Sequence, residues 1–137
     1  FAVTGRPVGW QRAGRNGSRY FTRPETARYQ DEIRYAFLEE AQRNNNTNTP
    51  YREADYVTVR IFAYFKAPRS WSRKKRQDAY LKPYPQKPDA DNISKSVLDA
   101  LNGVAWKDDK QVYDLRITKK YGEAEGIVVD MDFWFEE

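Results

Sequence analysis

Hydrophobic and polar residues alternate along three stretches of the chain, the pattern of β-strands that bury one face. These stretches are residues 56–65, 111–121 and 126–135. The first, YVTVRIFAYF, carries apolar residues on both faces, so we expect its second face to be half covered. The sequence GEAEG separates the last two stretches and predicts a turn, so we expect them to pair as an antiparallel hairpin.

Apolar residues recur every three or four positions from residue 24 onward, which predicts an amphipathic helix of roughly 20 residues. Thr22 is the expected N-cap, and Glu25 follows it as in a capping box. The helix is expected to close near Asn44. The polar run NNNTNTP, residues 44–50, then reads as a linker.

Shorter signals complete the order of elements. Residues 1–4 predict a short strand, and a short helix is expected to begin near Ser70 or Ser72. A second amphipathic helix is expected from Asp91 or Asn92, as N-cap, to a C′ glycine at Gly103. The main elements then follow in the order β-α-β-α-β-β, which predicts an α+β fold in a single domain over residues 1–137.

Two residue types are missing, and their absence narrows the chemistry. The chain contains no cysteine, which suits a reducing cytoplasm, and no histidine, the commonest general base. Acid–base or metal chemistry must therefore use Asp, Glu, Lys, Tyr or water, and oxygen ligands favour a hard cation such as Mg²⁺ or Mn²⁺. No apolar run approaches the roughly 20 residues that span a bilayer, so we expect a cytoplasmic protein that does not enter a membrane.

Positive charge is concentrated in two segments. Residues 1–23 contain five arginines and no acid, and residues 66–88 contain eight lysines and arginines with Asp78 alone. Because the net charge is only +4, the rest of the chain is acidic. Basic segments around a carboxylate site would suit a polyanion such as nucleic acid, although two solvated loops would have the same composition.

The stretch KPDADNISKSVLDALNGVAWKDD, residues 87–109, contains five aspartates. If the chain is extended after Pro88, Asp89 and Asp91 share one face and make a pair of metal ligands. Lys95 and Asp99 continue from Asp91 at helical i, i+4, i+8 spacing, so the lysine lies beside the aspartates. The simpler alternative is an N-cap with surface ion pairs, and an exposed turn for the aspartates at 108 and 109.

This pattern, KPDADNxxKxxxDALNG…WKDDxQV, resembles the RusA family of Holliday junction resolvases, small endodeoxyribonucleases that are frequent in prophages. GRPVGWQR, SWSRKKR and ITKKYG also look like phage members of the family. The resemblance implies a mixed sheet with helices packed on it. It places the metal-binding aspartates at Asp89, Asp91 and Asp109 and the catalytic lysine at Lys95. Asp108 matches a less critical neighbour, and Asp99 is expected to be structural.

The resemblance further implies a homodimer that resolves four-way DNA junctions in recombination and repair. We expect Mg²⁺, with Mn²⁺ as a substitute, to support paired phosphodiester hydrolysis. The aromatic strand 126–135 is a candidate dimer surface, and Trp71 or Tyr80 is a candidate for stacking on unpaired bases. The expected DNA contacts are Arg6, Arg12, Arg15, Arg73, Lys74, Lys75, Arg76 and Lys119. Two alternatives stay open: a non-catalytic nucleic-acid-binding module, and a metal-dependent nuclease acting on flaps or RNA.

Overall fold

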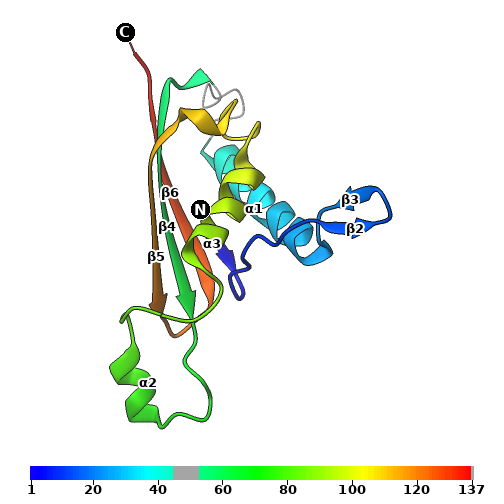
Figure 1. The fold of residues 1–137 in the computed structure, drawn as a ribbon. Helices are drawn as coiled ribbons and strands as arrows, with labels where there is room; N and C mark the ends of the chain where they lie inside the picture. The colour runs from blue at the N-terminus through cyan, green and yellow to red at the C-terminus, as the bar shows by residue number, and fades with distance from the viewer. Residues whose placement is uncertain (45–52, 137) are drawn as a thin grey trace.

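The computed structural model describes residues 1–44 and 53–136 (Figure 1). Its elements are β1 (Ala2–Thr4), β2 (Gly14–Asn16), β3 (Arg19–Phe21), α1 (Pro24–Arg43), β4 (Tyr56–Phe65), α2 (Arg73–Ala79), α3 (Ala90–Leu101), the 3₁₀ helix η2 (Asp109–Gln111), β5 (Val112–Tyr121) and β6 (Gly126–Trp134). Six of them, β1-α1-β4-α3-β5-β6, reproduce the predicted order, so the α+β fold is confirmed. The linker predicted over 44–50 lies, after Asn44, outside the described residues.

Four strands form one mixed sheet in the order β1-β6-β4-β5, with β4 parallel to β5 and antiparallel to β6. The predicted β5–β6 hairpin is therefore wrong, because β4 lies between the two strands. The connection passes over the end of β4, where the Gly122 N–H donates to the Phe65 carbonyl (2.9 Å). The reason lies in composition: β4 is apolar enough for the centre, whereas β5 carries lysines and other charges typical of an edge strand.

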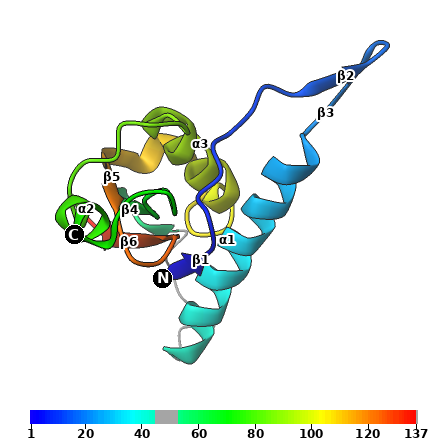
Figure 2. The same ribbon diagram turned by 90° about the horizontal axis from the view of Figure 1, so that it is seen from below.

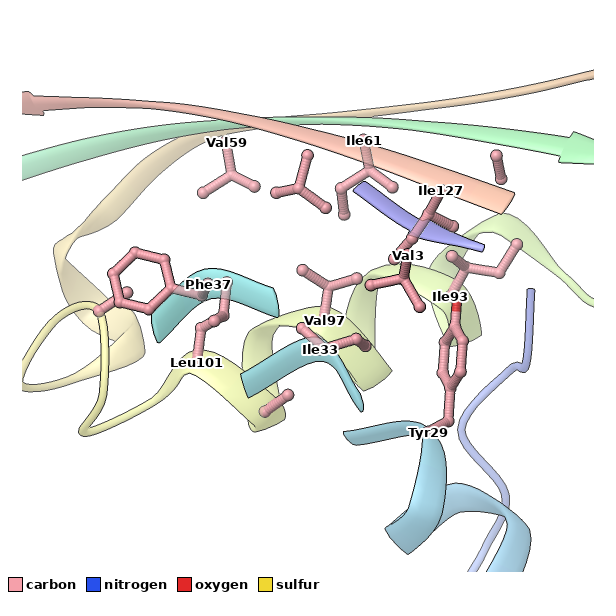
Figure 3. Close-up of a cluster of buried hydrophobic side chains, with 14 of the residues drawn as sticks. Val3, Tyr29, Ile33, Phe37, Val59, Ile61, Ile93, Val97, Leu101 and Ile127 are labelled. Atoms are coloured by element: carbon pink, nitrogen blue, oxygen red, sulfur yellow. The ribbon is translucent and has the colours of Figure 1, made fainter. Parts of the chain in front are cut away.

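The core lies between one face of this sheet and the two long helices. Figure 1 shows α1 and α3 on the same side of the sheet, and Figure 3 shows Val59 and Ile61 of β4 directed toward Ile33 of α1 and Val97 of α3. All four side chains are buried. This packing fixes α3 beside β5 and so determines where its polar side points. None of the helices in the described part of the chain is long and apolar enough to cross a membrane.

The ends of the helices differ in how well they were predicted. α1 begins at Pro24 with Arg23 as N-cap and without a side-chain cap bond, so the capping box expected from Thr22 does not form. The short helix α2 has the expected N-cap at Ser72, whose hydroxyl accepts from the Lys75 N–H (3.1 Å). α3 ends as expected, because Gly103 follows it with φ of +77°.

A small hairpin of β2 and β3 projects from the body of the molecule beside the start of α1 (Figure 2). It was not predicted, because its strands are only three residues long and show no apolar alternation. The Phe21 ring covers Gly14 so closely that a Cβ there would lie 2.2 Å from a ring carbon. The hairpin carries Arg15 and Arg19, so part of the basic N-terminal segment extends into solvent.

Candidate active site

The predicted site begins at the first turn of α3. Asp89 is the N-cap, with extended backbone (φ −67°, ψ 146°), and the helix starts at once at Ala90. The expectation that Asp89 and Asp91 share a face of an extended chain is therefore wrong. Pro88 restricts only the residue before it, and two helical positions are turned about 200° apart, so the two carboxylates leave the turn on different sides.

On one side, α3 and β5 form a shallow hollow of about 560 Å³. We call it the acidic hollow; the residues that line it are Ala90, Asp91, Ser94, Lys95, Leu98, Asp99, Asp109, Leu115 and Ile117. The i, i+4, i+8 spacing along α3 thus brings Asp91, Lys95 and Asp99 to one place, as expected. Asp109, which the family resemblance placed with the metal ligands, joins them from η2. Asp99 was expected to be structural. It lines the hollow because it follows Asp91 and Lys95 at helical spacing along α3.

Asp109 is held in place by two neighbours in its own loop. The indole Nε1 of the fully buried Trp106 donates to Asp109 Oδ1 (2.7 Å). Asp108 caps η2 and forms a capping box with Gln111, which fixes the backbone at Asp109. The two adjacent aspartates therefore differ in role: Asp108 builds the turn, and Asp109 lies in the hollow.

Two of the carboxylates in the acidic hollow, those of Asp99 and Asp109, have raised pKa values. Burial is the main cause that raises the pKa of Asp99, the negative charge of Asp109 adds to it, and Lys95 opposes it. Burial also raises the pKa of Asp109, against the hydrogen bond from Trp106, which lowers it. The hollow thus holds more negative charge than its single lysine balances.

Lys95 lies at the edge of the acidic hollow against the N-terminal segment. Its Nζ is 3.6 Å from the centroid of the Trp10 ring, a cation–π contact. Trp10 is itself tied to α3, because its backbone N–H donates to the Asn92 carbonyl (2.9 Å). The aromatic ring therefore limits the positions that the ammonium group can take.

Asp89 faces a second hollow, of about 530 Å³, between residues 6–11 and residues 87–92. Its carboxylate lies 3.6 Å from Lys87 Nζ. Burial lowers the pKa of Lys119, and the negative charge of Asp89 opposes this shift. Asp89 is thus separated from the other predicted ligands and is partly compensated by lysines.

The donor chemistry of the acidic hollow suits a hard cation. Its acidic groups offer only oxygen ligands, and its three carboxylates outnumber its single lysine. Within residues 1–44 and 53–136, however, no three acidic side chains are arranged as a complete metal site. The residues therefore fit Mg²⁺ in kind, and Asp89 is the predicted ligand that the structure does not bring to the others.

The eight basic residues predicted to contact DNA differ in their position and in their hydrogen-bond partners. Arg6 donates to Glu125 and to the Tyr84 hydroxyl, and the Tyr84 bond is the main cause that raises its pKa. Lys119 donates to the Gln86 and Pro88 carbonyls and so anchors the strand leading to Asp89. Arg12 lies exposed before the hairpin that carries Arg15, and the remaining four, Arg73, Lys74, Lys75 and Arg76, are on α2. Arg6 and Lys119 thus have internal partners, and DNA contact stays a prediction for all eight.

Two comparisons with known proteins bear on this site. A family model described as "Endodeoxyribonuclease RusA" matches residues 4–132. The Bacillus subtilis (strain 168) protein called "Uncharacterized protein YqaN" is 34% identical over 137 residues, covering 94% of this chain and 92% of that protein. Both matches include α3, η2 and β5, the elements that form the acidic hollow.

Proposed function

Because the chain belongs to the RusA family of endodeoxyribonucleases, hydrolases that act on Holliday junctions, we propose that its acidic hollow is a Mg²⁺-dependent active site that cuts four-way DNA junctions. One observation supports this most directly: three carboxylates and a lysine line one open hollow beside β5. Carboxylates without a counter-charge would repel DNA, so such a hollow favours a divalent cation between protein and phosphate.

Asp91 and Asp109 are the residues we propose to hold the cation, with Asp89 as a third ligand that must leave Lys87 to join them. When bound, Mg²⁺ supplies charge for the phosphate oxygens and lowers the pKa of a ligated water. Trp106 orients Asp109 for this role through its N–H. Asp99 adds negative charge beside the ligands and strengthens the attraction for a cation.

Lys95 is proposed to stabilise the negative charge that builds on the phosphate during cleavage. Its ammonium group lies on the Trp10 ring at the rim of the hollow, where the DNA backbone would enter. A cation held in advance costs little reorganisation at the moment of reaction. With no histidine in the chain, the water must lose its proton to solvent or to a carboxylate.

A homodimer is also proposed, because paired cuts in a two-fold symmetric junction require two active sites. The face of the sheet opposite α1 and α3 has no described helix on it (Figure 1). It carries exposed aromatic residues, Tyr113 and Trp134 among them, beside charges of both signs such as Arg60 and Asp130. A surface of this kind is self-complementary across a two-fold axis.

Light scattering tests the dimer with one matched pair of substitutions. Tyr113→Glu on β5 should give a monomer, whereas Tyr35→Glu on the exposed side of α1 should leave a dimer, since the two tyrosines are similarly exposed (65% and 71%). A monomeric wild-type chain at micromolar concentration would contradict the proposal.

The nuclease proposal is tested on a labelled four-way junction, a flap, a duplex and a structured RNA under one set of conditions. We expect cleavage of the junction in Mg²⁺ and none in EDTA. Asp91→Asn should keep junction binding but lose cleavage by at least roughly 10–100-fold, the cost of losing even an indirect partner of a metal, since a proposed metal ligand is removed. Asp31→Asn on the exposed side of α1 is the control and should cleave normally.

The outcomes separate the alternatives. Cleavage by Asp91→Asn at the wild-type rate would reject the proposed site. Junction binding that ignores Mg²⁺, with no product on any substrate, would favour a non-catalytic binding module. Preferential cleavage of the flap or the RNA would favour a nuclease of different selectivity.

A further inference from the structure

A separate cavity of about 450 Å³ lies between the α2 segment and the turn after β5. We call it the arginine pocket; its main lining residues are Lys66, Arg69, Arg73, Arg76, Tyr80 and Tyr121. Its volume falls within the about 300–1,000 Å³ typical of sites for small molecules. None of the acidic hollow's residues contributes to it.

The cations of the arginine pocket are not neutralised by ion pairs. The ion pairs found within residues 1–44 and 53–136 involve Lys87, Lys107, Arg6, Arg34 and the N-terminus, and none of the four pocket cations. Among the residues that line the pocket, Glu123 alone is acidic. Four positive groups around a concavity focus a positive potential there, so the pocket favours an anionic ligand.

The aromatic residues of the arginine pocket have two different roles. Tyr121 is held from both sides, by Tyr84 (5.0 Å between ring centroids) and by Trp71 (5.8 Å), so it forms a fixed wall. Lys75 Nζ lies 4.1 Å from the centroid of the Trp71 ring, which covers one face of that ring. Tyr80 is 47% exposed, so its ring is the one that offers a free face to a ligand. Of the two residues considered for stacking, Tyr80 is therefore favoured.

The arginine pocket and the acidic hollow are joined by one strand. Ile117 lines the acidic hollow and Tyr121 lines the arginine pocket, and both side chains are on the same face of β5. Lys119 lies between them on that face. Four residues of a strand span about 13 Å, the length of about four nucleotides in one strand of B-form DNA. Residues 82–88 lie between the two sites and bind Lys119 and Tyr121 through hydrogen bonds. A DNA strand that joins the acidic hollow to the arginine pocket would therefore pass over this segment.

We propose that the arginine pocket binds an unpaired nucleotide of the branched DNA substrate, with the phosphate between the arginines and the base on Tyr80. Arginine suits this role because its planar group binds phosphate through paired hydrogen bonds. A paired base is stacked inside a duplex and does not reach a concave aromatic site, so the pocket selects unpaired strands. This inference rests on the proposed function, because it assumes that DNA is the substrate.

The test uses the Asp91→Asn chain in EDTA, so that binding is measured without cleavage. The probes are a fluorescein-labelled single-stranded 15-mer and a duplex of the same length, followed by fluorescence anisotropy. Tyr80→Leu should weaken binding of the single strand by about 5- to 150-fold, the range for one base–aromatic stack, and binding of the duplex by less than twofold. Tyr80→Phe should restore single-strand binding, because the ring is what matters.

Two charge changes give matched controls. Lys66→Gln in the arginine pocket should weaken binding of the single strand more than Lys82→Gln, which lies in the same basic segment but does not line the pocket. Glu123→Gln should strengthen it, because the opposing charge is removed. Equal effects of the two lysine changes, or weaker binding by Glu123→Gln, would overturn the inference.

The arginine pocket and the nuclease proposal can be rejected independently of each other. If Tyr80→Leu binds the single strand like its parent while the wild type cleaves junctions in Mg²⁺, only the arginine pocket is rejected. If the wild type cleaves no junction but the Tyr80 and Lys66 effects appear, the pocket binds single strands and the nuclease proposal is rejected.

Discussion

Replacing Trp106 by phenylalanine removes the N–H that donates to Asp109 and leaves most of the aromatic ring in the core. The lost bond is partly buried and has a charged acceptor (2.7 Å), so its loss costs about 1.5–3 kcal/mol. Trp106 is fully buried, and the smaller ring leaves a void that costs about 1 kcal/mol more. The free energy of unfolding should therefore fall by about 2.5–4 kcal/mol.

The same substitution predicts a pH dependence with a definite sign. Burial already raises the pKa of Asp109, and Trp106→Phe raises it further because a bond to the charged form is lost. A carboxyl group whose pKa is raised by folding stabilises the folded state, relative to neutral pH, when the pH is below its ordinary pKa of about 3.9. This contribution disappears as the pH rises through the folded-state pKa. The difference in stability between wild type and Trp106→Phe should thus be larger at pH 7 than at pH 3.5.

Urea unfolding followed by far-UV circular dichroism measures both effects. Trp71→Phe is the control, because Trp71 is only partly buried and its contacts are to Lys75 and Tyr121 rather than to a carboxylate. A double-mutant cycle with Asp109→Asn isolates the pair, and we expect a coupling of at least about 1 kcal/mol. A coupling near zero, or equal losses for Trp106→Phe and Trp71→Phe, would refute the assigned role of Trp106.

Three further substitutions test other parts of the molecule. Gly14→Ala places a Cβ against the Phe21 ring, so it should open the β2–β3 hairpin and weaken junction binding as measured by anisotropy. The thermal midpoint should change little, because the hairpin lies outside the core. An unchanged affinity would exclude the hairpin from DNA binding. Gly103→Ala forces a left-handed residue (φ +77°) at the end of α3 and should cost about 1 kcal/mol in urea unfolding; a neutral result would argue against this cap. Asp99→Asn should stabilise the fold at pH 7, because burial and Asp109 raise the pKa of Asp99, so its negative charge opposes folding at that pH. The gain in stability should vanish below about pH 3.9. A loss of stability at pH 7 would contradict the reasoning.

The order and bounds of the main elements could be predicted because they depend on local periodicity. β4 occupies the predicted residues 56–65, and α1 ends at the predicted cap Asn44. The pairing of β5 with β4 rather than with β6 could not be predicted from the turn between them. A four-residue connection can join adjacent strands or pass over one strand, and only the distribution of charge along β5 distinguishes an edge strand from a central one.

The candidate site shows the same limit at the scale of single residues. Helical spacing correctly grouped Asp91, Lys95 and Asp99, because these positions lie on one element. The placement of Asp89 failed because it depends on where the helix begins, and helix starts are uncertain by a few residues from sequence. Trp106 was not recognised as the partner of Asp109, since a buried indole in a loop has no periodic signal.

The uneven distribution of charge around the first turn of α3 suggests an order of events at the proposed site. Asp89 already has Lys87 within 3.6 Å and Lys119 nearby, whereas the carboxylates of the acidic hollow have only Lys95 among the residues that line it. A first divalent cation therefore gains most at Asp91 and Asp109, where negative charge is least compensated. The Lys87–Asp89 pair is exposed and therefore weak, so Asp89 can turn toward a cation at little cost. An approaching DNA phosphate also offers Lys87 a new partner. On the proposed function, binding of DNA would thus help Asp89 to join Asp91 and Asp109 around the cation.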